Sequence, residues 1–265
     1  MEIFFLKSFV GHEPRRRKNL IPTLLERSGN LIEKIGSTFA NDTELTEIFF
    51  GLSDDKTDFE SGFDFKKPSW TDMLNYYPNS TITTEVLYEE IGGGLPENLK
   101  KNPNSWENSC AVRMCKALNY SKAKLPKAPS AGGNIFGKDK NNYWIRVKDL
   151  KKYLVDKLTT KSKKSADVDE IGGIDIVDKF KDKKGIIVFD VSGWGNASGH
   201  FTLWDGVDLK YVGADSPEHN DPTDTEYYYF NMNYQDTDYE GNLLYNKDGT
   251  PKMVKTTRIR LWELE

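Results

Sequence analysis

The chain has 265 residues, of which 37% are hydrophobic and 29% charged, so it has enough apolar material for a sizeable folded core. Its 37 basic and 41 acidic residues give a formal net charge of -4, which argues against a nucleic acid as the main partner. No apolar run approaches the ~20 residues of a membrane-spanning helix. The apolar start of the chain is short and precedes its basic cluster, so we expect no Sec-type export signal.

The first 65 residues differ from the rest of the chain. Residues 20–35 and 43–52 carry apolar side chains at helical spacing, which predicts two helices. The acidic, glycine-containing stretch 53–67 is typical of a linker. We therefore predict a small helical extension over residues 1–65, followed by one domain over residues 66–265.

The next part of the chain is predicted to be helical. Residues 104–109 supply polar capping residues directly before Cys110. Apolar side chains then recur at i, i+3, i+4 and i+7, which predicts one buried helical stripe: Ala111, Met114, Cys115 and Leu118. A loop over 126–137 ends this helix, a second amphipathic helix is expected over 147–158, and residues 161–169 are expected to be exposed.

After residue 184 the periodicity is that of strands. An apolar run bounded by glycine predicts a buried strand over 185–191, and a glycine-rich turn separates it from the next strand. The further expected segments are strands over 200–204, 207–212, 227–230 and 256–264, with a turn-rich stretch over 242–249. Helices followed by an antiparallel sheet predict an α+β domain.

Two cysteines, Cys110 and Cys115, lie five residues apart on one predicted helix and point in different directions, so both are expected to be free thiols. Two are too few for a zinc cage. Cys110 stands at the start of the helix, where the macrodipole and free N–H groups lower the pKa of a thiol. Cys115 lies deeper in the stripe and is explained as a small core residue. The alternative for Cys110 is a structural role as well.

One of the three histidines lies where a catalytic base could lie. His12 belongs to the N-terminal segment and His219 to a polar loop, whereas His200 opens a predicted strand after a glycine-rich turn. A helix-borne cysteine followed much later by a strand-borne histidine is the order of papain-like hydrolases. Such a pair hydrolyses amides by nucleophilic catalysis, so we expect no metal and no cofactor. The backbone N–H of Cys110 is the predicted donor to the oxyanion.

Three stretches resemble the fourth family of type VI secretion amidase effectors, which are papain-like, NlpC-type peptidoglycan hydrolases. They are Asn108-Ser109-Cys110-Ala111-Val112-Arg113-Met114, Ser192-Gly193-Trp194 and Ser198-Gly199-His200-Phe201-Thr202-Leu203-Trp204-Asp205-Gly206. The resemblance extends from about residue 68 to residue 264 and leaves residues 1–65 unaccounted for. It implies a papain-like fold, with the cysteine-bearing helix packed on an antiparallel sheet. It also implies a Cys–His–Asp triad containing Cys110 and His200.

The resemblance also implies a function and partners. Family members cut peptidoglycan stem peptides between D-glutamate and meso-diaminopimelate, in the periplasm of a rival cell, and a cognate immunity protein neutralises them. The chain would be cytoplasmic in its producer and leave without a Sec signal, with a secretion apparatus component as a further partner. For residues 1–65, which the resemblance does not cover, two roles stay open: a delivery or docking module for a secretion apparatus, or a helical pair packed on the catalytic domain. The extra cysteine pair that follows the histidine in the family is absent.

The third member of the implied triad is an aspartate on the strand that returns after the turn. A tight two-residue turn after Trp204 would place Tyr211, which is not a carboxylate, opposite His200. A wider loop over 205–210 pairs Trp204 with Tyr211 and brings Asp215 opposite His200, so we predict Asp215. The further candidates are Asp208 and Asp205.

Three other residues are candidates for substrate binding. Trp106, Trp194 and Asn196 are predicted to line the groove, because exposed aromatic rings pack on sugar and peptide surfaces; for both tryptophans core packing is the alternative. Two other functions stay open: a papain-like acyltransferase or deamidase with the same pair, and a non-catalytic cell-wall binding protein. Thiol alkylation separates these, since a catalytic Cys110 is expected to react far faster than Cys115.

Overall fold

The computed structural model describes residues 65–159, 165–169, 175–195, 197–213, 229–238 and 240–265. The helical extension predicted over residues 1–65 lies outside the described residues, except for the buried Phe65. The boundary between an extension and a catalytic domain therefore stays a prediction. Within the described residues, no helix has both the length and the apolar character needed to cross a membrane.

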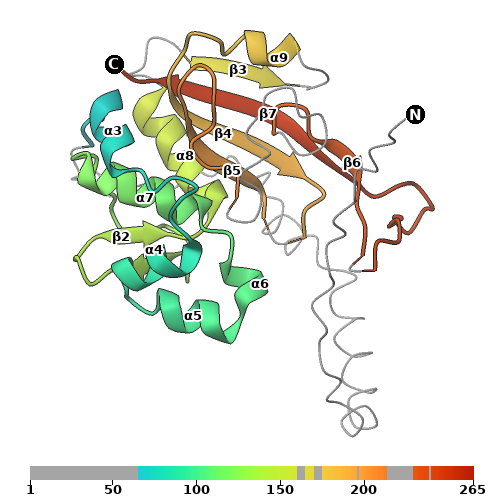
Figure 1. The fold of residues 1–265 in the computed structure, drawn as a ribbon, viewed down its shortest axis with the longest axis horizontal. Coiled ribbons are helices and arrows are strands. Elements are labelled where there is room, and N and C mark those ends of the chain that lie inside the picture. The colour runs from blue at the N-terminus through green and yellow to red at the C-terminus, as the bar shows by residue number, and fades with distance from the viewer. Residues whose placement is uncertain (1–64, 160–164, 170–174, 196, 214–228, 239) are drawn as a thin grey trace, which may run out of the picture. The chain divides into compact units, whose positions relative to one another are not determined.

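Helices make up most of the first half of the described chain (Figure 1). They are α3 (Trp70–Tyr76), α4 (Thr84–Ile91), α5 (Leu95–Lys101), α6 (Pro103–Trp106), α7 (Cys110–Tyr120) and α8 (Val147–Leu158), with α9 (Asp175–Asp178) further on. The structure confirms α8 over the predicted residues and α7 from Cys110 onward. The polar stretch before Cys110 contains α6, which begins with Pro103, a residue that suits the first turn of a helix.

The strands form an antiparallel sheet and a separate hairpin (Figure 1). The sheet has the order β3-β7-β4-β5, with β6 also paired to β7. Its strands are β3 (Ser165–Asp169), β4 (Gly185–Ser192), β5 (Gly199–Trp204), β6 (Asn233–Gln235) and β7 (Met253–Glu263), and the hairpin consists of β1 (Asn134–Phe136) and β2 (Asn142–Trp144). Helices combined with an antiparallel sheet confirm the predicted α+β class.

Several segments of the structure differ from the prediction. Of the strand predicted over 207–212, only Leu209 forms a bridge, with Trp204, because the turn after β5 is held by its own hydrogen bonds. No strand is predicted over 161–169, where the structure has β3, an edge strand, and charged residues are common on such edges. Of the strand predicted over 227–230, the described residues Tyr229 and Phe230 lie in a turn. The hairpin β1–β2 was not predicted, because strands of three residues are too short to show an alternating pattern.

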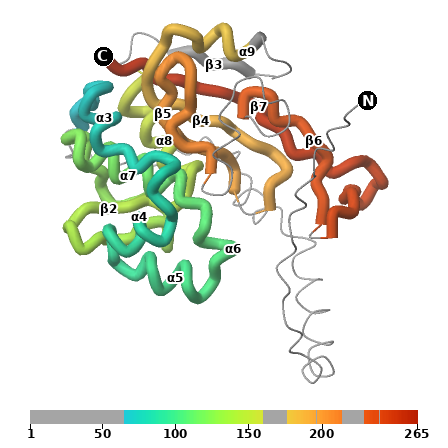
Figure 2. The backbone as a smooth tube through the Cα atoms, viewed as in Figure 1, coloured from blue at the N-terminus to red at the C-terminus, as the bar shows by residue number. Residues whose placement is uncertain are grey.

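The main sheet separates two apolar clusters. In β4, Ile186 and Val188 join the cluster that contains α3, α4, α7 and α8, whereas Ile187 and Phe189 join the cluster on the opposite face. This alternation follows from the two-residue period of a strand. Figure 2 shows α3, α4, α5, α6, α7 and α8 gathered on one side of the sheet, whereas α9 contributes Ile176 to the cluster on the opposite face. The packing brings the start of α7 against β5, the last strand in the sheet order.

Candidate active site

Cys110 is the first residue of α7, and its exposed fraction is only 6%. The four residues of the predicted helical stripe are all buried, which confirms it: Ala111, Met114, Cys115 and Leu118. Ser109 is the N-cap residue, but its side chain makes no capping bond to the helix. Its Oγ instead accepts a hydrogen bond from Arg113 Nε at 2.9 Å. The N–H groups of the first turn, including that of Cys110, thus have no helical acceptor and no bond to the N-cap side chain.

The pKa of the Cys110 thiol does not follow the prediction. Burial raises it above the ordinary value, and this outweighs the lowering by hydrogen bonds with the backbone of Phe201 and Ala111 and by the charge of Arg113. Removing a thiolate from water costs more free energy here than the helix N-terminus contributes by stabilising its charge. The expectation of a lowered pKa was therefore wrong, and in the free protein Cys110 is a neutral thiol near pH 7.

His200 is the second residue of β5, with an exposed fraction of 4%. Its Nε2 lies 2.8 Å from the main-chain carbonyl oxygen of Tyr211. The imidazole stacks on the ring of Tyr229, with ring centroids 4.1 Å apart and an interplanar angle of 8°. Burial lowers the pKa of His200 to about 4; the Tyr211 carbonyl opposes this shift and the charge of Arg113 adds to it. The ring is therefore uncharged at neutral pH.

Cys110 and His200 approach the same short stretch of β5. The helix that begins with Cys110 packs on β5, and the backbone of Phe201, the residue that follows His200, lowers the pKa of the Cys110 thiol. Tyr211 links the two sides, since its carbonyl contacts His200 and its hydroxyl lies 3.3 Å from the Oγ of Ser109, next to Cys110. Tyr211 therefore connects the strand that carries His200 with the start of α7, where Cys110 lies.

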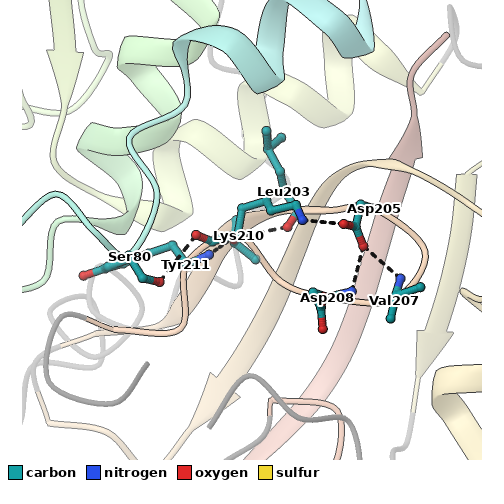
Figure 3. Close-up of polar contacts among 8 residues, drawn as sticks. Ser80, Leu203, Asp205, Val207, Asp208, Lys210 and Tyr211 are labelled. Atoms are coloured by element: carbon teal, nitrogen blue, oxygen red, sulfur yellow. Dashed lines mark hydrogen bonds and ion pairs between the residues drawn. The ribbon is translucent and has the colours of Figure 1, made fainter. Parts of the chain in front are cut away.

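The turn after β5 is tighter than predicted. Trp204 pairs with Leu209 and not with Tyr211, so the turn comprises residues 205–208 (Figure 3). The register that would bring Asp215 opposite His200 is therefore wrong. Asp215 itself lies outside the described residues, and its place in a triad stays a prediction.

Asp205 explains why this turn is tight. Its Oδ1 accepts hydrogen bonds from the N–H groups of Val207 at 2.9 Å and Asp208 at 2.7 Å, and its Oδ2 pairs with Lys210 Nζ (Figure 3). Such local bonds favour a short turn over a wide loop. Burial pushes the pKa of Asp205 upward, but Lys210 and the two N–H groups bring it below its ordinary value. Asp205 is a charged residue that stabilises the turn.

Arg113 is a further residue beside the site that the sequence pattern does not single out, and its side chain is fully buried on α7. Its guanidinium donates to the carbonyl oxygens of Pro78, Asn79 and Ile82, at distances from 2.6 to 3.0 Å. It also lies over the Tyr211 ring, 3.9 Å from the centroid. One feature of the sequence could have identified Arg113. It is an arginine in an otherwise apolar helical stripe, three residues after the candidate nucleophile.

The remaining predicted residues have mixed surroundings. Trp106 is half-buried and packs on the apolar cluster that contains α7 and α8. Its main-chain carbonyl accepts a hydrogen bond from the hydroxyl of Tyr88. Trp194 is also half-buried and meets the Tyr229 ring edge-on, at 6.2 Å. Asn196 lies outside the described residues. Within the described ranges, no three side chains of His, Cys, Asp or Glu form a group that could hold a metal ion.

Cys115 is a core residue, as predicted. It is fully buried, and its sulfur accepts a hydrogen bond from the N–H of Trp144 at 3.2 Å. Burial raises the pKa of Cys115 to about 12. Both cysteines are free thiols, which confirms the prediction that they form no disulfide.

Comparisons with known proteins match this part of the chain. Residues 106–262 match the family described as "Type VI secretion system (T6SS), amidase effector protein 4". A Tae4–Tai4 effector–immunity complex from Enterobacter cloacae is similar in structure, with a TM-score of 0.50 and 23% identity, over 76% of this chain and 100% of that chain. The effector Tae4 from Salmonella typhimurium, in complex with Tai4 from Enterobacter cloacae, has a TM-score of 0.50 and 24% identity, over 75% and 100%. No curated protein sequence matches the chain.

Proposed function

Because this chain belongs to the type VI secretion system amidase effector protein 4 family, we propose that it is a cysteine amidase of bacterial peptidoglycan. Membership makes the chain an amidase effector. The bond that we propose it cuts is the one between D-glutamate and meso-diaminopimelate in the stem peptide. The fold we propose is of the papain-like, NlpC type, with Cys110 as nucleophile and His200 as base.

One observation carries this proposal. Cys110 is the first residue of α7, and this helix packs on β5, the strand that carries His200. The matched family region contains both side chains. The pair is neutral before substrate binds, since burial raises the pKa of the thiol and lowers that of the imidazole. A neutral thiol next to a neutral imidazole requires proton transfer during attack, as in hydrolases with a serine nucleophile.

The reaction then follows from the groups that are present. Sγ of Cys110 attacks the γ-glutamyl carbonyl carbon while its proton passes to His200. The N–H groups of the first turn of α7, that of Cys110 among them, donate to the oxyanion. The C–N bond breaks as His200 returns the proton to the diaminopimelate amine, and a thioester remains. Water activated by His200 hydrolyses this thioester and restores the thiol.

The proposed setting is antibacterial. The two similar solved structures are complexes of an effector with an immunity protein, which supports a cognate immunity protein as a partner of this chain. We propose delivery to the periplasm of a target bacterium, after a cytoplasmic stage in the producer. Residues 1–65 are the candidate segment for contact with a secretion apparatus component.

Muropeptide mass spectrometry tests the bond that is cut. Sacculi of the diaminopimelate type are incubated with the wild-type protein and with Cys110→Ala. We expect new fragments that end at D-glutamate with the wild type and none with the variant. Fragments capped by an added amine would point to acyl transfer, and unchanged muropeptides with both folded proteins would contradict the proposed hydrolysis.

A further inference from the structure

We propose that the main-chain carbonyl of Tyr211 orients His200 in place of a side-chain carboxylate, and that Tyr229 is a positioning residue which holds the imidazole plane. The catalytic importance of this arrangement rests on the proposed function. The arrangement itself is a property of the folded chain and can be tested without substrate.

The contact with the carbonyl determines which nitrogen of His200 carries the proton. Nε2 lies 2.8 Å from the carbonyl oxygen of Tyr211, an ordinary hydrogen-bond distance. A carbonyl oxygen only accepts, so the hydrogen must be on Nε2. In a neutral imidazole the lone pair is then on Nδ1, which is the atom left to take the proton of Cys110. The carbonyl thus performs the tautomer selection that an aspartate performs in a triad.

The accepting carbonyl is held in place from two directions. The N–H of Tyr211 donates to Oγ1 of Thr202 at 2.9 Å, which fixes the main chain against β5. The Tyr211 ring lies under the guanidinium of Arg113, and its hydroxyl lies 3.3 Å from Oγ of Ser109, so α7 fixes the side chain. A main-chain acceptor buried and held in this way is preorganised for its role.

Tyr229 limits the rotation of the imidazole. Its ring is almost parallel to that of His200, and it also packs on Phe189, with ring centroids 5.2 Å apart. Its hydroxyl donates to the carbonyl of Val212 at 2.9 Å, and its own carbonyl accepts from Oγ1 of Thr256 at 2.6 Å. Tyr229 is thus held at its hydroxyl and at its main chain. Its ring therefore keeps the stacked imidazole in the plane that points Nε2 at the carbonyl of Tyr211.

The charges around the ring support a neutral acceptor. In the part of the chain that the structure describes, no carboxylate forms a bond or ion pair with His200. The groups that can carry charge and that interact with it are Tyr211 and Tyr229, and Arg113 on α7. A carboxylate partner would raise the pKa of a histidine, whereas that of His200 lies at about 4.

Nitrogen-15 NMR of the histidine rings tests the proposal on the full chain. The chain has three histidines, and His200→Gln identifies the signals of His200. We expect the Nε2–H tautomer at pH 7 and protonation only near pH 4, both unchanged in Asp215→Asn and in Tyr211→Phe, which keeps the carbonyl. An Nδ1–H tautomer would overturn the proposal. So would a pKa above 6.5 that falls in Asp215→Asn, because a carboxylate would then be the orienting group.

Two further variants test the roles of the groups. A 2-hydroxy acid in place of Val212 turns the Tyr211 carbonyl into an ester, a weaker acceptor, and we expect kcat to fall at least ~10-fold with KM unchanged, together with some Nδ1–H tautomer. Tyr229→Leu removes the stacked ring and is expected to lower kcat and split the His200 signals, whereas Tyr229→Phe keeps one signal. A single unshifted signal in the ester and in Tyr229→Leu would contradict the proposed positioning. If the NMR results hold but no peptidoglycan is cut, the proposed function fails and the orientation of His200 stands.

Discussion

The rings of His200 and Tyr229 stack face to face, with centroids 4.1 Å apart and an angle of 8° between their planes. Together with the carbonyl of Tyr211, this contact encloses an imidazole that is 4% exposed. The cost of charging a ring so enclosed has consequences both for catalysis and for folding.

The first consequence concerns stability. The pKa of His200 is about 4 in the folded protein and ~6.5 for an ordinary histidine, so between these values the unfolded chain binds more protons. The contribution of His200 is complete above pH 6.5 and is lost as the pH falls toward 4, by ~3 kcal/mol. Urea unfolding at pH 7 and pH 4.5 measures it. In His200→Gln this part of the pH dependence should vanish; an identical dependence in the variant would contradict the buried neutral ring.

The acid side of the pH–rate profile follows from the same pKa. A base with a pKa of about 4 remains neutral, and able to accept a proton, at pH 5. We therefore expect kcat/KM at pH 5 to keep most of its neutral-pH value, whereas an ordinary histidine would lose more than ~90%. The measurement uses a soluble muropeptide, with circular dichroism at each pH to show that the protein is folded. Half-maximal activity near pH 6.5 would contradict the assignment.

Thiol alkylation distinguishes the two cysteines by pH. Burial raises the pKa of Cys110 and raises that of Cys115 to about 12. We expect iodoacetamide to label Cys110 slowly at pH 7 and faster toward alkaline pH, and at every pH far faster than Cys115, which is fully buried and stays almost unlabelled. Mass spectrometry of the peptides measures both rates, and Cys115→Ala isolates Cys110. Fast labelling of Cys110 at pH 7 would contradict the raised pKa. It would instead support the thiolate that the position at the start of the helix predicts.

Arg113 is expected to be important for stability. Its guanidinium satisfies three main-chain carbonyls and Ser109 Oγ, and a lysine cannot reproduce this geometry. Arg113→Lys should lower the free energy of unfolding by ~2–4 kcal/mol, because buried acceptors lose their donors. Arg146 is exposed and donates to a single carbonyl, so Arg146→Lys is the matched control and should change it by less than ~0.5 kcal/mol. Equal effects of the two substitutions would contradict this role.

The sequence predicts those parts of the fold that local patterns encode. The apolar spacing after Cys110 and over 147–158 gives α7 and α8, and the glycine-bounded apolar run gives β4. β3 is missed because its polar residues pair with β7, a partner about 90 residues away along the chain. Hydrogen bonds to a distant strand leave no local period in the sequence.

The surroundings of the site could be predicted less well than its position. The chain order of Cys110 and His200 indicates the pair, but its pKa values depend on burial by distant elements. The register after β5 depends on the side chain of Asp205, which bonds its own turn. Tyr229 comes near His200 only through the tertiary fold, and no spacing along the chain predicts a stacked ring.

The most direct measurement is the rate of hydrolysis of a purified disaccharide tetrapeptide that contains meso-diaminopimelate. Wild type, Cys110→Ala and Cys115→Ala are compared, each first shown to be folded by circular dichroism. We predict that Cys110→Ala lowers kcat/KM by at least ~10⁴-fold, whereas folded Cys115→Ala stays close to the wild type. Hydrolysis by Cys110→Ala at the wild-type rate would contradict the assignment of Cys110 as the nucleophile.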